Sequence, residues 1–310
     1  MTEELNIGVR FALYVNLMLL FGLPLYALYA LKGAERLQAN ILPRGLTCWL
    51  SASGIALSLF SITAMTASMA GVDLFEVDSA SVSVMIFETP MGNAWSVRMM
   101  ALLITFAAAF RINATKGLPK LMFVAFGSAV SLSSLAWTGH GAASEGVTGT
   151  AQLIADIIHL IAAGAWLGAL AALTIILFNG SEASSQAYLK MTHRLLKGFS
   201  VAGSIIVALV FGSGLINSWM LVGPQNVLTL YTTAYGQLLI AKLFLFGIML
   251  SLAASNRFAL TPAFERALQA GVTSLALTKL RRSLAFELIL ATIILGLVAY
   301  LGTLQPPVAT

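Results

Sequence analysis

Long runs of apolar residues follow one another along the whole chain, and short polar segments separate them. The apolar runs cover approximately residues 10–31, 45–70, 94–110, 119–138, 151–178, 198–221, 235–256 and 284–304. Each run is close to or above the ~20 residues that an α-helix needs to cross a hydrocarbon core of ~30 Å. Because lipid offers no partner to unpaired backbone groups, the pattern predicts an all-α polytopic membrane protein with about eight transmembrane helices.

Composition supports this interpretation. Apolar residues make up 59% of the chain and charged residues only 9%, so the chain cannot cover its own surface against water. Glu3 and Glu4 precede the first apolar run, where a secretory signal would carry basic residues, and that run is too long for a signal. We therefore expect the first run to be a retained helix, and residues 1–310 to form a single transmembrane domain.

The distribution of charge predicts the orientation. Of 17 basic residues, 14 lie in or beside alternate loops: Lys32, Arg36, Arg44, Arg111, Lys116, Lys120, Lys190, Arg194, Lys197, Arg257, Arg266, Lys279, Arg281 and Arg282. The intervening loops carry acidic residues instead: Asp73, Glu76, Asp78, Glu88 and Glu145. The positive-inside rule then places the basic loops in the cytoplasm and both termini outside. The net charge of +5 is accounted for by this cytoplasmic rim and calls for no nucleic-acid partner.

The segment 262–282 combines apolar residues on one helical face with nearby basic residues. Such a segment is typical of an amphipathic helix that lies on the inner leaflet and contacts membrane lipid. An ordinary helix packed under the bundle fits the pattern equally well.

A weak internal repeat relates the two halves of the chain. Thr89, Gly92, Trp95 and Arg98 stand three apart, and so do Thr233, Gly236, Leu239 and Lys242, which follow 144 positions later. Both sets lead into a transmembrane run from the same predicted side. The spacing indicates two parallel four-helix repeats, 1–138 and 151–304, with the 262–282 segment inserted before the last helix.

Five ionisable residues fall inside the predicted spans: Arg98, Asp156, His159, Lys242 and Glu287. Each is a functional candidate, because a charge at the bilayer centre costs ~2.5–3.5 kcal/mol on insertion scales. Arg98 and Lys242 lie near the outer surface, where they could also extend to the headgroups or pair with Asp156. Glu287 is expected near the start of the last helix, neutralised by Arg281 or Arg282.

Asp156 and His159 are three apart and share one helix face, and Trp166 follows two turns after His159. His140 lies in the short loop before this helix and could reach over His159. A carboxylate can hold one imidazole N–H and leave the other nitrogen free as a metal ligand. We therefore predict a metal site of His140 and His159, with Asp156 and Trp166 as supporting residues.

The distribution of methionines along the chain indicates which metal such a site would bind. Nine of twelve methionines fall in the predicted outer half: Met1, Met18, Met65, Met69, Met85, Met91, Met99, Met100 and Met220. Thioethers are soft ligands that suit Cu(I). Met65 and Met69 share one face of the second helix, so these two and Met99 join the candidate ligands. Methionine is also ordinary apolar filler, and that alternative stays open.

Several motifs together resemble the copper resistance protein D family. They are the stretch from His140 through Gly168, with Asp156, His159 and Trp166; Thr89-x-x-Gly92-x-x-Trp95-x-x-Arg98; the run Tyr235 to Lys242; and the ending Glu287, Gly302 and Pro306. The resemblance covers nearly the whole chain. It implies a multi-pass protein of the bacterial inner membrane that takes copper from the periplasm toward the cytoplasm, in copper resistance and homeostasis. It also implies a separate periplasmic copper-binding partner of the CopC type.

Two other functions fit the same residues. A b-type cytochrome or other membrane redox protein would use His140 and His159 as axial haem ligands. A membrane scaffold would dock a periplasmic copper carrier through the acidic loop 71–93 without transporting copper. An enzyme is not expected, because the chain has no HExxH, Walker, GxSxG or paired-carboxylate signature.

Overall fold

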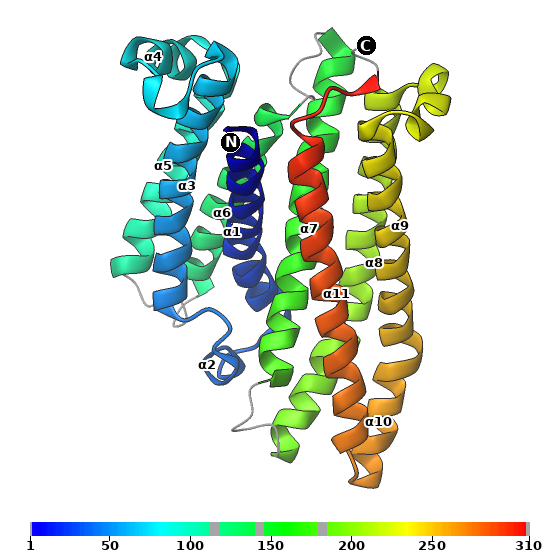
Figure 1. Cartoon of the computed structure of the whole chain (residues 1–310). Coiled ribbons are helices and arrows are strands. Elements are labelled where there is room, and N and C mark those ends of the chain that lie inside the picture. The colour runs from blue at the N-terminus through cyan, green and yellow to red at the C-terminus, as the bar shows by residue number, and fades with distance from the viewer. Residues whose placement is uncertain (1, 112–117, 140–145, 179–184, 308–310) are drawn as a thin grey trace.

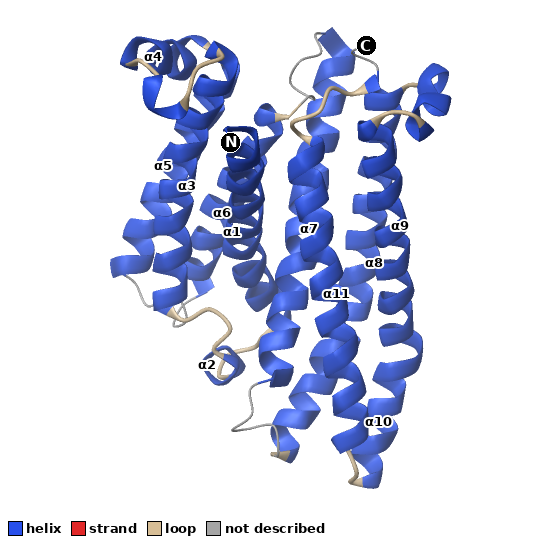
Figure 2. Ribbon diagram, in the orientation of Figure 1, coloured by secondary structure: helices blue, strands red, loops and turns tan. Residues whose placement is uncertain are grey.

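A computed structural model describes residues 2–111, 118–139, 146–178 and 185–307, and these ranges are helical without any strand (Figure 2). Within them, eight helices are long and apolar enough to cross a membrane. They are α1 (Thr2–Ala30), α3 (Arg44–Ala70), α5 (Pro90–Arg111), α6 (Leu118–Ser133, continued by the 3₁₀ turn η3, Ser134–Thr138), α7 (Gly146–Phe178), α8 (Gln186–Val222), α9 (Ala234–Ser255) and α11 (Ser274–Leu301). The predicted all-α polytopic membrane fold is confirmed.

The observed helices begin earlier than the apolar runs do. α1 begins at Thr2, α8 at Gln186 and α11 at Ser274, so each has several polar or charged residues before its apolar stretch. Helical backbone continues through these turns because water and headgroups can solvate their side chains. A hydropathy pattern registers only the apolar stretch of a helix.

The helices form two groups of four. α1, α3, α5 and α6 lie on one side of the bundle, and α7, α8, α9 and α11 lie on the other (Figure 1). α1 and α7, the first helix of each group, form the most extensive contact in the molecule. The first group falls within residues 1–138 and the second within residues 146–301, and an internal repeat relating them stays a prediction from the sequence.

Glycines allow the close approach of α1 and α7. A Cβ atom added at Gly22 would collide with the backbone of Gly164 and Gly168, and one added at Gly168 would collide with Gly22. Gly164 and Gly168 are four residues apart, so both lie on the face of α7 toward α1. Helices in lipid associate largely through such close packing of small residues.

The two related sequence motifs form the same local structure. Thr89 precedes α5 and accepts a hydrogen bond from the N–H of Gly92 at 2.9 Å; Thr233 precedes α9 and accepts one from Gly236 at 3.2 Å. Any side chain at either glycine would collide with the backbone of the short helix before it, which is α4 (Ser79–Glu88) or η5 (Pro224–Tyr231). The motif therefore caps a helix and leaves room for the preceding one.

The two ends of the bundle differ in charge. α1 begins and α11 ends at the same end, together with η1 (Leu74–Glu76), α4 and η5; we call this the terminal end (Figure 1). α2 (Glu35–Ala39) and α10 (Thr261–Ala270) lie at the opposite end with many basic residues, which we call the basic end. Arg194 of α8 pairs with Glu35 of α2 and so ties the two groups together there.

Residues 262–282 do not form one continuous helix. α9 passes through a π-helical turn, η6 (Asn256–Leu260), directly into α10, which ends at Gly271 in a left-handed conformation (φ +74°). The remainder of the segment is the beginning of α11. Buried Phe264 packs α10 against the bundle.

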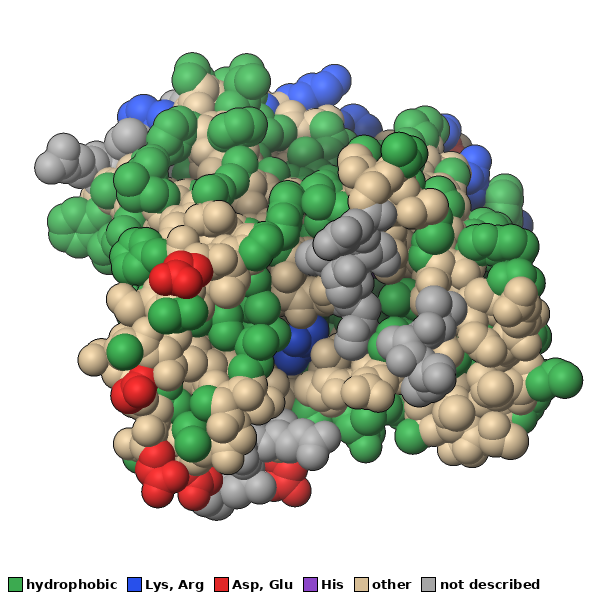
Figure 3. Space-filling view, turned by 90° about the horizontal axis from the view of Figure 1, so that it is seen from above, with side chains coloured by type: hydrophobic (Ala, Val, Ile, Leu, Met, Phe, Trp, Pro, Cys, Tyr) green, Lys and Arg blue, Asp and Glu red, His purple; other side chains and the backbone are tan. Residues whose placement is uncertain are grey.

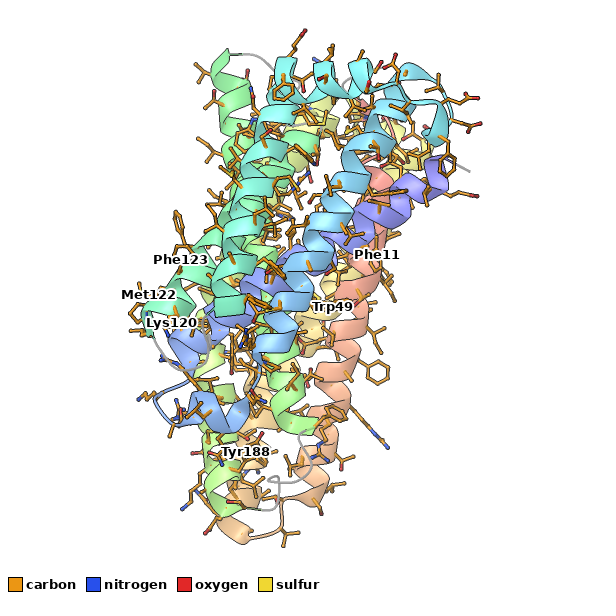
Figure 4. All side chains as sticks on the ribbon, turned by 90° about the vertical axis from the view of Figure 1, so that its left-hand side faces the viewer. Phe11, Trp49, Lys120, Met122, Phe123 and Tyr188 are labelled. Carbon is orange, nitrogen blue, oxygen red and sulfur yellow. The ribbon has the colours of Figure 1, made fainter. Side chains whose placement is uncertain are left out.

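The two groups differ at one helix pair. α3 packs against α5, whereas the corresponding α8 and α9 barely touch along the residues described. We call this gap the α8–α9 seam. Apolar side chains such as Trp49, Met122 and Phe123 point away from the bundle, as expected for a lipid-facing surface (Figure 4).

Candidate functional site

A polar cavity of about 160 Å³ opens beside the seam near the terminal end. Its wall combines α7, α8, α9, α11 and α1, and we call it the central cavity. Its polar lining comes from Arg10, Asp156, His159, Asn217, Ser218, Tyr235 and Lys242. Three of the five intramembrane residues singled out in the sequence therefore meet at one place.

His159 is held by α8 and not by its neighbour Asp156. Its Nδ1 lies 3.0 Å from Ser213 Oγ, and the Ser213 hydroxyl donates to the Leu209 carbonyl oxygen at 2.6 Å. Because the Ser213 proton is donated to Leu209, the serine oxygen acts as the acceptor toward His159. The imidazole then carries its proton on Nδ1 and its lone pair on Nε2. Gly214 provides the space, since a Cβ there would lie 3.4 Å from the ring. This is the arrangement of a histidine oriented to bind a metal.

Asp156 faces Asn217 and Lys242. Its carboxylate accepts a hydrogen bond from the Asn217 side chain and lies close enough to Lys242 for the two charges to interact. Tyr235 lies near the same carboxylate. Asp156 thus offsets the charge of Lys242 in a buried setting, where an unpaired charge would be costly.

Two arginines behave differently from each other. Arg10, which the sequence interpretation passed over, lines the central cavity, where NH1 donates to the Thr138 carbonyl oxygen at 3.4 Å. Arg98 is 1% exposed and interacts with Tyr14, away from Asp156. The proposed pairing with Asp156 therefore belongs to Lys242 and not to Arg98.

A wider hollow of about 650 Å³ lies above the central cavity at the terminal end. Met65, Met69, Asp73 and Glu76 line it, and it shares Arg10 and Gly302 with the central cavity; we call it the vestibule. Viewed from this end, the face is hollowed near its centre with a basic side chain at the bottom, and acidic side chains gather along one side (Figure 3). Methionine thioethers and carboxylates thus line the vestibule, which lies between the terminal end and the central cavity.

Trp166 lies two turns of α7 beyond His159, as the sequence predicts, and lines a different cavity. It is 4% exposed and lines a third cavity of about 310 Å³, which opens between α8 and α9 toward the basic end. We call this the basic-end cavity. The ring of Phe246 on α9 meets Trp166 edge to face, with centroids 5.9 Å apart. Trp166 therefore lines the basic-end cavity, whereas His159 lines the central cavity.

Glu287 also differs from expectation. It was expected near the start of its helix and neutralised by Arg281 or Arg282, but α11 begins 13 positions earlier at Ser274. Arg281 donates to the Leu177 carbonyl oxygen at 2.7 Å instead. Glu287 is 1% exposed, lines the basic-end cavity and accepts a hydrogen bond from Asn256.

Comparison with known proteins gives the family. A family model described as copper resistance protein D-like, N-terminal domain, matches residues 1–150, and one described as copper resistance protein D matches residues 193–301. Copper resistance protein D of Pseudomonas syringae pv. tomato is 42% identical over 307 residues, which cover 99% of this chain and 98% of that protein. The chain belongs to the copper resistance protein D family.

Two further relatives are more distant from this chain. Inner membrane protein YebZ of Escherichia coli is 29% identical over 97% of this chain and 98% of its own length. Copper transport protein CutJ of Bacillus subtilis is 29% identical over 79% of this chain and 44% of its own length. No solved structure matches the chain. The eight apolar helices and these relatives identify a multi-pass inner-membrane protein, and no relative's name supports the haem alternative.

Some residues predicted for this copper resistance family member are not brought together. His140 lies outside the described residues. Met99 is half-buried on α5 and is not among the residues lining the three cavities. Within the described ranges, no three His, Cys, Asp or Glu side chains cluster as a metal site would require. The described candidates are instead spread along a line from the vestibule to the central cavity.

Proposed function

We propose that the chain is a copper permease of the bacterial inner membrane, which moves copper from the periplasm toward the cytoplasm. The observation that carries the proposal is His159, whose Nδ1 is engaged with Ser213 and which lines a cavity that shares Arg10 and Gly302 with a methionine-lined vestibule. Membership of the copper resistance protein D family supports copper as the cargo. The positive-inside rule supports the orientation, with the terminal end in the periplasm.

In this proposal, copper first binds in the vestibule. Met65 is half-buried and Met69 is 69% exposed, so thioethers are available at the rim and further in. Exposed Asp73 and Glu76 attract cations to the same hollow. Soft ligands at an outward-facing surface favour Cu(I) over the harder cations that are more abundant there.

The ion then moves to His159 in the central cavity. Asp156 offsets Lys242, so the cavity presents fewer uncompensated positive charges to an incoming cation. The remaining positive group is Arg10, at the junction of the vestibule and the central cavity, and its Nε has no hydrogen-bond partner among the described residues. Movement of Arg10 would open the connection between the two hollows.

The acidic surface at the terminal end supports docking of a periplasmic copper carrier of the CopC type. Asp73, Glu76, Asp78 and Glu88 are exposed on η1, α4 and the adjoining turns, and Phe75 among them is 97% exposed. A hydrogen bond from Ser81 lowers the pKa of the Asp78 carboxyl and keeps it charged. An exposed aromatic ring bordered by charges is typical of a contact surface.

The test is copper accumulation in cells that express the protein, compared between wild type and His159→Ala. We expect the variant to accumulate no more copper than cells without the protein. His193→Ala is the matched control, because His193 lies at the basic end beside Glu265, 3.6 Å away. Unchanged accumulation in His159→Ala, at equal membrane abundance, would overturn the assignment.

A further inference from the structure

A pair of aromatic rings lies along the bundle between the level of the central cavity and that of the basic-end cavity, which Trp166 lines. Trp166 of α7 and Phe246 of α9 meet edge to face at 5.9 Å, with planes at 72°. His159 precedes Trp166 by seven residues, which is ~10 Å of helix, and Lys242 precedes Phe246 by one turn. The rings thus meet between α7 and α9, beside the α8–α9 seam and below the polar groups of the central cavity. An edge-to-face contact between two rings adds little stabilisation beyond the area that it buries, so the rings can separate at modest cost.

Below the rings, the basic-end cavity contains a buried carboxylate. Glu287 is 1% exposed and accepts a hydrogen bond from the Asn256 side-chain amide. Asn256 begins the π-helical turn that ends α9. π-Helical turns are frequent at functional sites. Asn256 Oδ1 and the nearby Ser283 Oγ have no hydrogen-bond partner among the described residues. A carboxylate, an amide oxygen and a hydroxyl, from Glu287, Asn256 and Ser283, are therefore available as oxygen ligands in this part of the bundle.

The charged groups around this cavity are mostly engaged elsewhere. Lys197 and His193 of α8 face Glu265 of α10, at 4.0 and 3.6 Å. Arg194 pairs with Glu35, and Arg281 donates to the Leu177 carbonyl oxygen. Arg257 lines the cavity, donates to Ser204 and lies over the Phe258 ring at 5.1 Å. None of these described contacts neutralises Glu287.

We propose that Trp166 and Phe246 form a gate, and that Glu287 with Asn256 is the cation-accepting site on its basic side. This inference rests on the proposed function, since copper is the cation that passes. A single carboxylate offsets the single charge of Cu(I), while oxygen ligands hold this soft ion only weakly. Weak binding at the exit favours release after tight binding by thioether and imidazole at the entrance. The route therefore runs along the α8–α9 seam, from the vestibule through the central cavity to the basic-end cavity.

Thiol labelling tests the gate without any transport assay. Cys48 is the one cysteine of the chain, so Cys48→Ser gives a cysteine-free background. Single cysteines at Ser218, in the central cavity, and at Ala253, in the basic-end cavity, are exposed to a membrane-impermeant thiol reagent in vesicles of either orientation. We expect Ser218→Cys to react from the terminal side alone and Ala253→Cys from the basic side alone. Reaction of both from the same side would overturn the gate.

Trp166→Ala in the same background should remove the barrier. Ser218→Cys should then react from both sides, whereas the peripheral replacement Trp49→Ala, at a 65% exposed side chain, should leave the pattern unchanged. Single-sided labelling that persists in Trp166→Ala would show that these rings are not the barrier.

Copper uptake into vesicles with purified protein tests Glu287. We expect Glu287→Gln to abolish uptake while copper still binds at His159, and Glu265→Gln, a surface carboxylate at the same end, to behave as wild type. Wild-type uptake by Glu287→Gln would overturn the Glu287 site and leave the permease function standing. Absence of uptake by the wild type would overturn the permease function itself. If Glu287→Gln fails to fold, Asn256→Leu removes the partner and should give the same loss of uptake.

Discussion

His159 Nδ1 and Ser213 Oγ lie 3.0 Å apart and join the faces of α7 and α8 at the central cavity. Both side chains belong to the second four-helix group, so the contact fixes the imidazole within one half of the molecule. Because the serine hydroxyl donates to Leu209, its role toward the histidine is that of an acceptor. The orientation of the proposed copper ligand therefore depends on a residue 54 positions away in the sequence.

Replacing Ser213 by Ala should weaken copper binding without removing the ligand. Loss of a partner that orients a metal-binding histidine costs about 10–100-fold in affinity. Competition with a chromophoric Cu(I) chelator on the purified protein measures this. Ser251→Ala on α9 is the control, since the Ser251 hydroxyl likewise donates to a carbonyl oxygen of its own helix, that of Gly247 at 2.9 Å. Equal affinities for Ser213→Ala and wild type would contradict the role given to Ser213.

Asp156→Asn should leave Lys242 without its compensating charge. A buried positive group beside the route would then oppose a cation, and we expect copper uptake to fall about tenfold, which corresponds to about 1.4 kcal/mol. Asp156→Asn combined with Lys242→Gln should restore much of the uptake, because both charges are gone. A double variant no better than the single one would argue against charge compensation.

Met65→Leu with Met69→Leu should lower the copper bound per protein while the fold is retained. Leucine and methionine have similar volumes, so the exchange costs less than about 1.5 kcal/mol of stability. Copper content of the purified protein measures the effect. Met122→Leu, on the outer surface of α6 and 56% exposed, is the matched control. Full copper content in the double variant would show that the vestibule methionines are filler.

Gly22→Ala should destabilise the whole bundle. The added Cβ would collide with the backbone of α7 at Gly164 and Gly168, and overpacking of this kind typically costs about 1–3 kcal/mol. Thermal unfolding in detergent, followed by loss of the monodisperse peak in gel filtration, measures the change. Gly247→Ala on α9 meets nothing within 4 Å and should unfold at the wild-type temperature. Similar unfolding of both variants would contradict a tight α1–α7 contact.

Sequence reasoning predicted the eight helices well, because a transmembrane helix is recognisable from its own residues. The same holds for Asp156, His159 and Trp166, whose relative positions follow from the period of one helix. It failed for Ser213 and Asn217, which are neutral residues in an apolar run of α8 and reach the site only through helix packing. Contacts between helices depend on which faces meet, and no local pattern records that.

For Arg10 and Glu287, the sequence contained a pattern that would have predicted their position in the structure. Arg10 is one of three basic residues outside the alternate basic loops, together with Arg98 and Lys242, and it lines the central cavity. Glu287 was placed near a helix start because the first turns of α11 are polar and basic, and so resemble a loop. Helical periodicity in those turns would have moved the start of the helix outward and left Glu287 deep in the bundle.

The parting of α8 from α9 makes the surrounding bilayer part of the wall of the route. Phe211 and Leu215 on α8, like Leu243 and Phe244 on α9, turn outward, so acyl chains border the seam between them. Chain length and unsaturation of the lipids should therefore influence how readily the two helices separate. A detergent tail that enters the seam would block it, so the proposed copper movement is best tested in membranes of defined lipid composition.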